Sequence, residues 1–206
     1  MEQIYKEIEK YYTKKIQQHG PSPQGVDWNG WNSQFIRFEQ LSKIISANEF
    51  FSIGDIGCGY GKYFEYLQNR FDKFSYIGYD LSKEMIENAK NLYANGGEFL
   101  QIKSNNEIKE SDYIVASGIF NVKNEIIESE WLYYILSTIE IMNKKSKKGF
   151  AFNVLTKYSD KEYMKNYLYY ADPLFLFDYC KRNFSRNVAL LHDYDLYEFT
   201  ILVRKE

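Results

Sequence analysis

The chain carries three closely spaced glycines with an acidic residue just before them, a pattern suited to holding a ligand. Gly57, Gly59 and Gly61 follow Asp55 in the stretch 52–67, which reads SIGDIGCGYGKYFEYL. Glycines allow positive φ angles and let the backbone approach a ligand without a Cβ in the way. A helix that begins after such a turn offers its free N–H groups and its dipole to a negatively charged group. The alternative interpretation is a tight strand-to-helix turn without a ligand.

A second acidic residue, Asp80, ends an apolar stretch 19 residues after Gly61. The stretches 50–56 and 74–80 read as strands, and a helical pattern that opens at Tyr63 lies between them. Together they predict a β-α-β unit. A carboxylate at the tip of its second strand can accept hydrogen bonds from both hydroxyls of a ribose, so we expect Asp80 to bind one.

The rest of the chain supplies the elements that must position these residues. Apolar periodicity and turn residues predict an amphipathic helix over 4–18, a Gly/Pro loop over 19–31 and a helix whose buried face is Phe35, Phe38, Leu41 and Ile45. Further predicted elements are a strand at 98–102, a strand with its exit loop at 112–121, a helix at 131–145, a strand at 149–155, a capping box at 159–162, a helix from Asp172-Pro173 and a terminal hairpin over 187–203.

Composition limits the class of protein. A chain of 206 residues with 45% apolar content is typical of one domain, here divided into N-terminal helices and lid (1–48) and a core (49–206). The net charge of −2 argues against a nucleic-acid partner, and two cysteines are too few for a disulfide framework. The N-terminus lacks an apolar signal region, and no stretch reaches the ~18 apolar residues of a membrane helix. We therefore expect a cytoplasmic monomer or homodimer without membrane insertion.

The glycine spacing separates two families of nucleotide-binding folds. Dinucleotide folds use G-x-G-x-x-G, whereas G-x-G-x-G with an acid two residues upstream resembles motif I of the class I S-adenosylmethionine-dependent methyltransferases. The combination with GPSPQGVDW, RFEQL, YIGYDLS, DYIVASGIFN, FAFNVLT, YYADP and HDYDLYEFT is similar to a group of small bacterial members, many from gene clusters for surface polysaccharides. The resemblance implies an α/β, Rossmann-like fold: a seven-stranded, mostly parallel sheet with a reversed C-terminal strand and helices on both faces. A NAD-binding sheet lacks that reversed strand.

The resemblance also implies the cofactor, S-adenosylmethionine, with S-adenosylhomocysteine as the product. Asp55 would take its α-ammonium group, directly or through water. Leu81 and Met85 would pack on the adenine, although plain core packing is the alternative for Met85. The residues expected at the cofactor are Trp28, Arg37, Asp55, Gly57, Cys58, Gly59, Tyr60, Gly61, Asp80, Leu81, Met85, Ser104, Asn105, Ser117, Gly118 and Ile119.

Two of these assignments concern positions at which the family places a recurring side chain. Methyltransferases often have a basic or amide residue that meets the methionine carboxylate, and a guanidinium suits Arg37 for this role. The alternative is a surface ion pair of Arg37 with Glu39 or Asp27. Ser104 and Asn105 stand where the family often has an acid for the adenine amino group, so an Asn or backbone groups would replace it.

The acceptor should lie beyond the carboxyl ends of the strands, where open α/β sheets bind their ligands. Phe120 could face the sulfonium cation, which aromatic faces attract, and Asn121 could touch the acceptor. The loop 19–31 carries two tryptophans, and we interpret it as a lid, with a stiff linker as the alternative. The residues expected at the acceptor are His19, Phe120, Asn121, Asn153, Tyr158, Tyr169, Tyr170 and Tyr194.

His192 is the candidate general base. The sixth strand should run parallel to the fourth and fifth, so its carboxyl end would open on the same rim as Asn121 and Thr156. An unperturbed imidazole titrates near ~6.5 and can accept a proton at cellular pH. The alternative is a hairpin histidine that hydrogen-bonds the turn. No metal is expected, because the sulfonium is already a good leaving group.

These residues together predict methyl transfer to a small molecule. The acceptor atom would be an oxygen of a sugar or of a phosphoramidate or phosphate group, in a sugar or nucleotide-linked intermediate of capsule or surface polysaccharide biosynthesis. One alternative is a methyltransferase-like binding or regulatory protein without catalysis. A nucleotide-linked oxidoreductase is the other, and the glycine spacing and the terminal hairpin argue against it.

Overall fold

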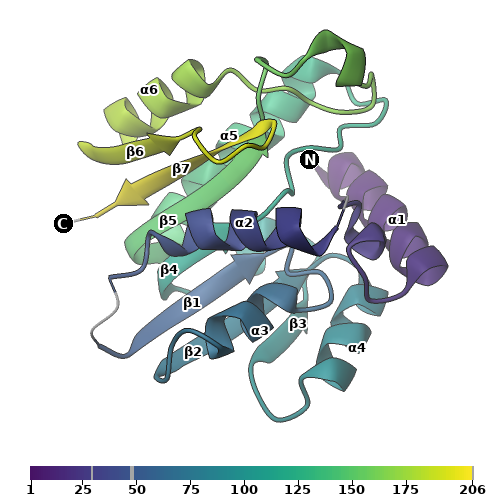
Figure 1. Cartoon of the computed structure of the whole chain (residues 1–206), viewed down its shortest axis with the longest axis vertical. Helices are drawn as coiled ribbons and strands as arrows, with labels where there is room; N and C mark the ends of the chain where they lie inside the picture. The colour runs from purple at the N-terminus through teal and green to yellow at the C-terminus, as the bar shows by residue number, and fades with distance from the viewer. Residues whose placement is uncertain (29, 47–48, 206) are drawn as a thin grey trace.

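The computed structural model describes residues 1–28, 30–46 and 49–205, which form alternating strands and helices (Figure 1). In chain order the elements are α1 (Glu2–His19), η1 (Gln24–Val26), α2 (Trp31–Ser42), β1 (Phe51–Ile56), α3 (Lys62–Gln68), β2 (Phe74–Asp80), α4 (Lys83–Leu92), β3 (Glu98–Gln101), η2 (Asn105–Glu107), β4 (Ser111–Ala116), α5 (Glu128–Lys145), β5 (Ser146–Leu155), η3 (Lys161–Tyr163), α6 (Pro173–Asn183), β6 (Asn187–Leu191) and β7 (Glu198–Arg204).

The strands form one seven-stranded sheet in the order β3-β2-β1-β4-β5-β7-β6. Neighbours from β3 to β5 pair in parallel, whereas β7 runs antiparallel to both β5 and β6 (Figure 1). The predicted mostly parallel sheet with a reversed C-terminal strand is therefore confirmed. Its strand order reverses between β1 and β4, and such a switch point opens a crevice beyond the carboxyl ends of the strands.

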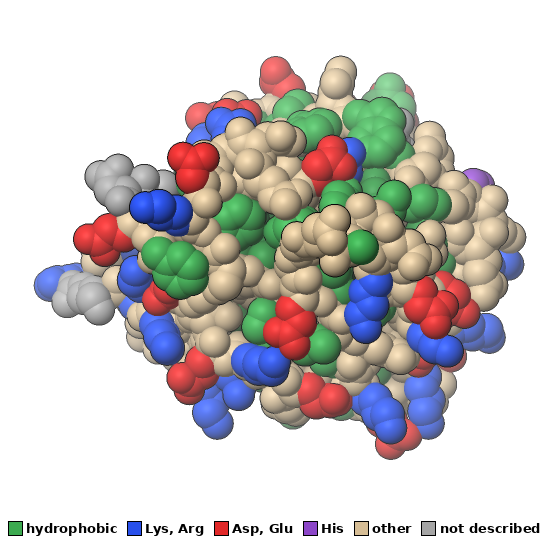
Figure 2. Space-filling model, turned by 90° about the horizontal axis from the view of Figure 1, so that it is seen from below, with side chains coloured by type: hydrophobic (Ala, Val, Ile, Leu, Met, Phe, Trp, Pro, Cys, Tyr) green, Lys and Arg blue, Asp and Glu red, His purple; other side chains and the backbone are tan. Residues whose placement is uncertain are grey.

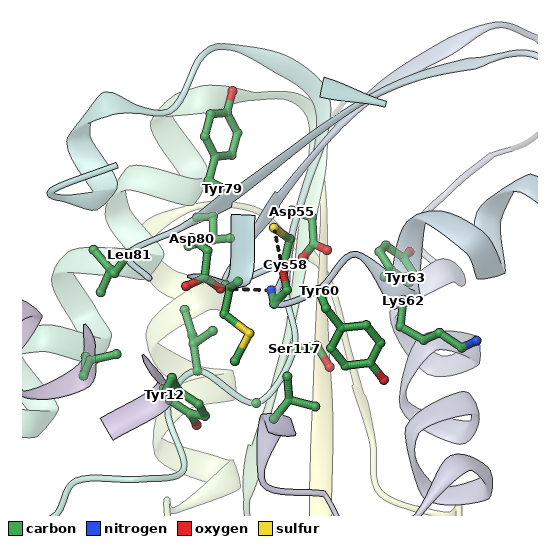
Figure 3. A pocket seen from close by; sticks show the side chains of 18 of the residues that line it. Tyr12, Asp55, Cys58, Tyr60, Lys62, Tyr63, Tyr79, Asp80, Leu81 and Ser117 are labelled. Carbon is green, nitrogen blue, oxygen red and sulfur yellow. Dashed lines mark hydrogen bonds between the residues drawn. The ribbon is translucent and has the colours of Figure 1, made fainter. Parts of the chain in front are cut away.

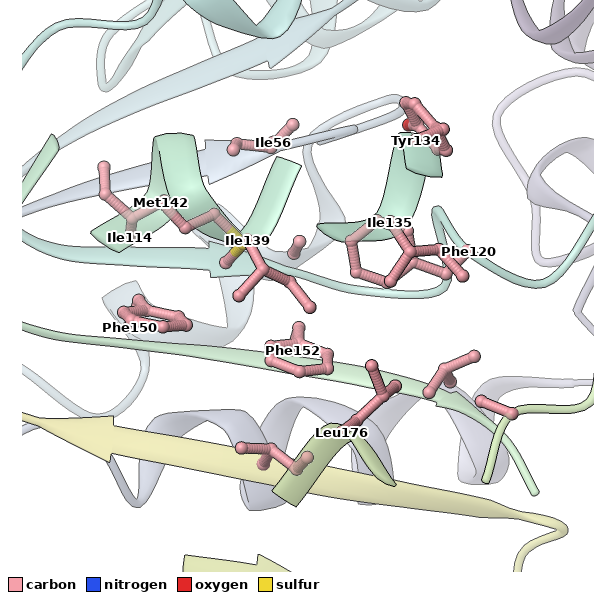
Figure 4. Close-up of a cluster of buried hydrophobic side chains, with 14 of the residues drawn as sticks. Ile56, Ile114, Phe120, Tyr134, Ile135, Ile139, Met142, Phe150, Phe152 and Leu176 are labelled. Atoms are coloured by element: carbon pink, nitrogen blue, oxygen red, sulfur yellow. The ribbon is translucent and has the colours of Figure 1, made fainter. Parts of the chain in front are cut away.

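Two helical layers cover the sheet and bury its apolar residues. The layer of α5 and α6 buries Ile135, Ile139 and Met142 of α5 against Phe150 and Phe152 of β5 (Figure 4). The other layer consists of α2, α3 and α4, and its core is rich in aromatic rings. Strand β5 is buried along its central residues on both faces, as its nearly continuous apolar sequence predicts.

Helix α2 begins without a side-chain cap. The helix begins at Trp31 after Gly30, and the Ser33 hydroxyl donates to the Gly30 carbonyl and does not cap a backbone N–H. Within the helix Phe38 and Leu41 are buried as predicted, whereas Phe35 is 39% exposed. Phe35 nevertheless contacts the ring of Phe38 within this aromatic layer.

The predicted capping box at 159–162 does not form. Only the short η3 follows Asp160, whose side chain caps no N–H, and the Ser159 hydroxyl donates to the Thr156 carbonyl. Residues 157–170 instead form a long loop between β5 and α6, which we call the 157–170 excursion, and tertiary pairing holds it in place. Thr156 bridges Ala171 where the excursion leaves and rejoins the body, and Leu168 bridges Val122 in the loop after β4. Tertiary pairing thus overrides the local helix signal.

The surface mixes charges of both signs. On the face that Figure 2 shows, acidic and basic side chains are interspersed around apolar patches. Within the described residues, no helix is long and apolar enough to cross a bilayer.

Candidate active site

The glycine-rich turn between β1 and α3 lies at the carboxyl end of the sheet and is fixed to its neighbour strand. The backbone N–H groups of Gly57 and Cys58 both donate to the Tyr79 carbonyl, at 2.7 and 3.0 Å. Gly57 has a φ of +71°, and a Cβ added there would lie 2.3 Å from Cγ2 of Ile119. Only glycine fits this position, because any other side chain would be both strained and in a clash.

Asp80 at the end of β2 organises the same turn from the other side. Its two carboxylate oxygens accept the backbone N–H groups of Gly59 and Ser82, each at 2.9 Å. Burial raises the pKa of Asp80 to about 6, and the backbone hydrogen bonds oppose this shift. Each carboxylate oxygen has a further lone pair, so Asp80 can also accept two ligand hydroxyls.

Asp55 is the second carboxylate of this site and is only 2% exposed. The Tyr76 hydroxyl donates to it at 2.7 Å. Burial raises the pKa of Asp55 to about 7; the Tyr76 hydrogen bond lowers it and the charge of Asp80 raises it further. A buried carboxylate with such a raised pKa would be stabilised in its ionised form by a bound cation, so Asp55 fits a ligand ammonium group.

These residues surround one cavity, which we call the cofactor cavity (Figure 3). Most of the residues predicted at the cofactor line it: Trp28, Asp55, Gly57, Cys58, Gly59, Tyr60, Asp80, Leu81, Met85, Asn105, Ser117, Gly118 and Ile119. Gly61 immediately precedes α3, and the Ser104 backbone N–H donates to the Glu107 carboxylate at η2; neither residue is among the lining residues. Ser82 caps α4 by accepting the Met85 N–H and so sets the start of that helix.

Asn105 occupies the position expected near an adenine but is already engaged by protein groups. Its side-chain amide donates to the Thr138 hydroxyl at 3.0 Å, and its backbone N–H donates to the Tyr5 hydroxyl at 3.4 Å. The residue is buried. Its amide oxygen remains the side-chain group suited to accept from a ligand amino group.

The N-terminal segment contributes a wall of the cofactor cavity that sequence reasoning missed. Ile8 and Tyr12 of α1, with Val26 of the following loop, line it. Their signal was present in the sequence, because Ile8, Tyr12 and Ile16 recur at helical spacing on one face of α1. That pattern gives an apolar face but cannot tell core packing from ligand contact. The predicted loop 19–31 includes Asn29, which lies outside the described residues.

Arg37 does not line the cofactor cavity, and its donors are engaged elsewhere. Its guanidinium donates to the buried Glu198 carboxylate at 2.7 and 2.9 Å and to the Ser33 carbonyl at 2.7 Å. Its face lies 3.8 Å from the ring centroid of Trp28. Neither proposed surface partner, Glu39 or Asp27, is correct. The ion-pair partner of Arg37 is Glu198, 161 positions later in the chain, and Asp27 pairs with Lys15.

A second cavity, of about 510 Å³, adjoins the first, and we call it the acceptor cavity. Among the residues predicted at the acceptor, Asn121 and Tyr170 line it. The Asn121 side chain donates to Glu198 at 3.0 Å and accepts the Leu155 N–H, so it joins β4, β5 and β7. Tyr12, Val26, Trp28 and Gly118 line both cavities and mark their junction.

Other residues predicted at the acceptor line neither cavity, and two of them are engaged in contacts within the protein. Phe120 is fully buried against Tyr134 and Phe152, so it cannot face a sulfonium. Asn153, also fully buried, accepts the Gly118 N–H at 2.7 Å and thereby holds the loop after β4. The residues that line neither cavity are His19, Phe120, Asn153, Tyr158, Tyr169 and Tyr194.

His192 is likewise absent from the lining of both cavities. It is exposed at the β6–β7 hairpin. The centroid of its ring lies 6.0 Å from the ring centroid of Phe199 and 6.4 Å from that of Tyr158. Strand β6 does run parallel to β5, as expected, but β7 is inserted between them. Two strand spacings, about 10 Å, therefore separate the end of β6 from the end of β5.

Comparisons with known proteins agree with this geometry. Residues 53–125 match a family model described as a methyltransferase domain. A protein of Mycobacterium tuberculosis, whose name describes it as a methyltransferase, is 49% identical over 163 residues, which are 79% of this chain and 98% of that protein.

Solved structures resemble the fold. A DhpI–SAH complex superposes with a TM-score of 0.66 at 12% identity, covering 98% of this chain and 96% of that one. The magnesium protoporphyrin IX methyltransferase of Synechocystis PCC 6803, with bound SAH, has a TM-score of 0.53 at 14% identity over 74% of each chain. The chain belongs to the class I S-adenosylmethionine-dependent methyltransferases, whose cofactor is S-adenosylmethionine.

Proposed function

We propose that this methyltransferase transfers its methyl group to an oxygen of a small molecule, such as a sugar hydroxyl or a phosphate or phosphoramidate oxygen, in the biosynthesis of capsule or surface polysaccharide. The observation that carries the small-molecule part is the acceptor cavity, which adjoins the cofactor cavity at Trp28 and Gly118. A cavity of this size admits a sugar-sized acceptor at the junction of the two sites.

The roles we assign to the cofactor residues follow from their chemistry. Asp55 would hold the α-ammonium group and Asp80 the ribose hydroxyls, while the turn 57–59 gives the backbone close access to the ligand. Leu81 and Met85 would contact the adenine, beside the amide of Asn105. The cofactor supplies an activated methyl group, and the protein supplies alignment.

Alignment by itself is a large part of catalysis in such a site. Holding the acceptor oxygen close to the methyl carbon converts a bimolecular step into an effectively unimolecular one, which can contribute ~7–11 kcal/mol. A neutral hydroxyl acceptor additionally needs a group that removes its proton. His192 lines neither cavity, so we leave it out of this mechanism.

The test is a binding and turnover experiment on the full chain. Calorimetry should detect binding of S-adenosylhomocysteine and none of NAD. Incubation with S-adenosylmethionine and extracted nucleotide sugars or polysaccharide precursors should then release S-adenosylhomocysteine, with a methylated product found by mass spectrometry. Binding without any methylated product would favour a regulatory, non-catalytic protein.

A further inference from the structure

The charges around the acceptor cavity are paired with one another. Arg37 contributes a cation to its wall, but Glu198, Ser33 and the face of Trp28 engage that guanidinium. Asp27 is paired with Lys15 at 2.5 Å. An anionic acceptor would therefore find the buried cation of this wall already neutralised.

The charges that remain lie at the rim. Glu162 and Lys165 line the same cavity from the 157–170 excursion, are exposed and have opposite signs. Lys165 lies 5.9 Å from the ring centroid of Tyr167. With the two ion pairs at the wall, the formal charges around the cavity cancel, so no net field favours an anion.

Aromatic side chains make up much of the remaining lining. Those of the acceptor cavity are Tyr12, Trp28, Tyr163, Tyr167, Tyr170 and Tyr197. Tyrosine and tryptophan offer a flat apolar face and one polar group each, which suits a ligand with C–H faces and hydroxyl edges. We infer that the acceptor of this enzyme is an uncharged, hydroxyl-bearing ring compound and that Asp27 is the group that accepts its proton. This inference rests on the function proposed above.

Asp27 is placed at the junction by its two neighbours. Val26 and Trp28 line both cavities, and Asp27 between them lines the acceptor cavity. Its φ of +62° is a conformation that non-glycine residues rarely adopt, and it is found where the surrounding structure enforces it. The side chain is 22% exposed, so a bound acceptor can reach it.

Two partners hold the Asp27 carboxylate in place. Lys15 donates to one oxygen and the Tyr11 hydroxyl to the other, at 2.5 and 2.8 Å. Burial, together with the hydrogen bond to Asp27, raises the pKa of Tyr11 well above its usual value, so Tyr11 remains a donor. In the transfer, the acceptor oxygen bonds to the methyl carbon as the carbon–sulfur bond breaks, the bonding pair stays on sulfur, and the hydroxyl proton passes to Asp27.

The acceptor class is tested with matched neutral and anionic probes. The full chain is incubated with S-adenosylmethionine and with methyl glycosides of common hexoses and deoxyhexoses, each compared with its sugar phosphate, and release of S-adenosylhomocysteine is measured. At least one neutral glycoside should show kcat/KM about 10-fold or more above its phosphorylated counterpart, a difference of about 1.4 kcal/mol.

Turnover confined to phosphorylated probes, or none with any neutral probe from protein that binds S-adenosylhomocysteine, would overturn the inference. Absence of S-adenosylhomocysteine binding would instead count against the proposed function as a whole.

Asp27→Asn tests the proton acceptor, since asparagine tolerates positive φ and keeps the shape of the side chain. It should lower kcat with the accepted glycoside by ~10²–10⁴-fold while leaving the affinity for S-adenosylhomocysteine unchanged. Asp195→Asn is the matched control, because Asp195 also has a positive φ, 54°, but lines neither cavity, and it should leave kcat unchanged. A kcat of Asp27→Asn within about threefold of wild type would reject the role, since general-base loss costs far more.

Discussion

The two cavities meet at a shared wall but are assembled in different ways. About half of the residues that line the cofactor cavity come from two short stretches, the glycine-rich turn after β1 with the start of α3, and the end of β2 with the start of α4. The acceptor cavity draws on the loop after η1, α2, the loop after β4, the 157–170 excursion and the start of β7. A site made of contiguous residues can be read from a motif, whereas a site made of distant segments depends on the finished topology.

The largest effect is expected at the cofactor cavity, from Asp80→Ala. Losing two hydrogen bonds to a charged group, at about 1.5–3 kcal/mol each, should weaken S-adenosylhomocysteine binding by ~10²–10⁴-fold in calorimetry. Asp178→Ala is a control on the exposed surface, where Asp178 pairs with Arg182. Unchanged affinity in Asp80→Ala would mean that the cofactor is held without Asp80.

The second prediction addresses the acceptor cavity, where Glu198→Leu leaves the Arg37 guanidinium buried without its partner. Breaking a buried pair in this way should lower the free energy of unfolding by about 3–5 kcal/mol in denaturant titrations. The double variant Arg37→Leu/Glu198→Leu should recover much of this loss, because no uncompensated charge remains. Since neither residue lines the cofactor cavity, S-adenosylhomocysteine affinity should persist in the folded fraction. Equal loss of affinity in both variants would show that the cavities are energetically one unit.

The third prediction uses the raised pKa values of Asp55, about 7, and Asp80, about 6. Because these folded-state values lie above the unfolded value of 3.8, the folded protein binds more protons between about pH 4 and 7, and its free energy of unfolding should fall as the pH rises through that window. Binding of a ligand ammonium requires ionised Asp55, so S-adenosylhomocysteine affinity should rise from pH 5.5 to 7.5 by at most ~10-fold per pH unit.

Calorimetry across this pH range, in buffers of different ionisation enthalpy, checks the third prediction by counting released protons. Asp55→Asn should flatten the profile and leave only the weaker contribution of Asp80. An affinity that falls as the pH rises would contradict the assigned role of Asp55.

The smallest effect should appear at the wall that both cavities share. Amide exchange of the loop between α1 and α2 should slow when S-adenosylhomocysteine binds, because Val26 and Trp28 of this loop line the cofactor cavity. Exchange in α6, which lines neither cavity, is the internal reference. Protection that is identical with and without ligand would favour a stiff linker over a lid.

The sequence predicted best where neighbours along the chain decide the outcome. The turn 57–61 and the hairpin of β6 and β7 depend on local rules, and the structure has both. Arg37 shows where prediction from local sequence ends. Its partner Glu198 lies near the other end of the chain, and no sequence periodicity indicates that the two residues pair.

Two other residues lie elsewhere than the sequence led us to expect, for reasons of topology. Phe120 follows β4 as expected, but its ring packs into the core and its carbonyl accepts the indole N–H of Trp131. His192 is displaced because β7 lies between β5 and β6. The packing of a loop side chain such as Phe120 and the order of the strands both depend on the finished fold, and neither could be obtained from these residues alone.

The way in which the 157–170 excursion is attached has a consequence for engineering the acceptor specificity of such an enzyme. Its two ends are joined at the Thr156–Ala171 bridge, and the Lys157 and Ala171 N–H groups donate to carbonyls across that neck, at 2.9 and 2.8 Å. A segment that leaves and returns at one point can be exchanged without changing the span that its neighbours must bridge. Grafting this segment from one relative into another should therefore transfer the acceptor preference of the donor protein, while the sheet and the cofactor-binding residues of the recipient remain unchanged.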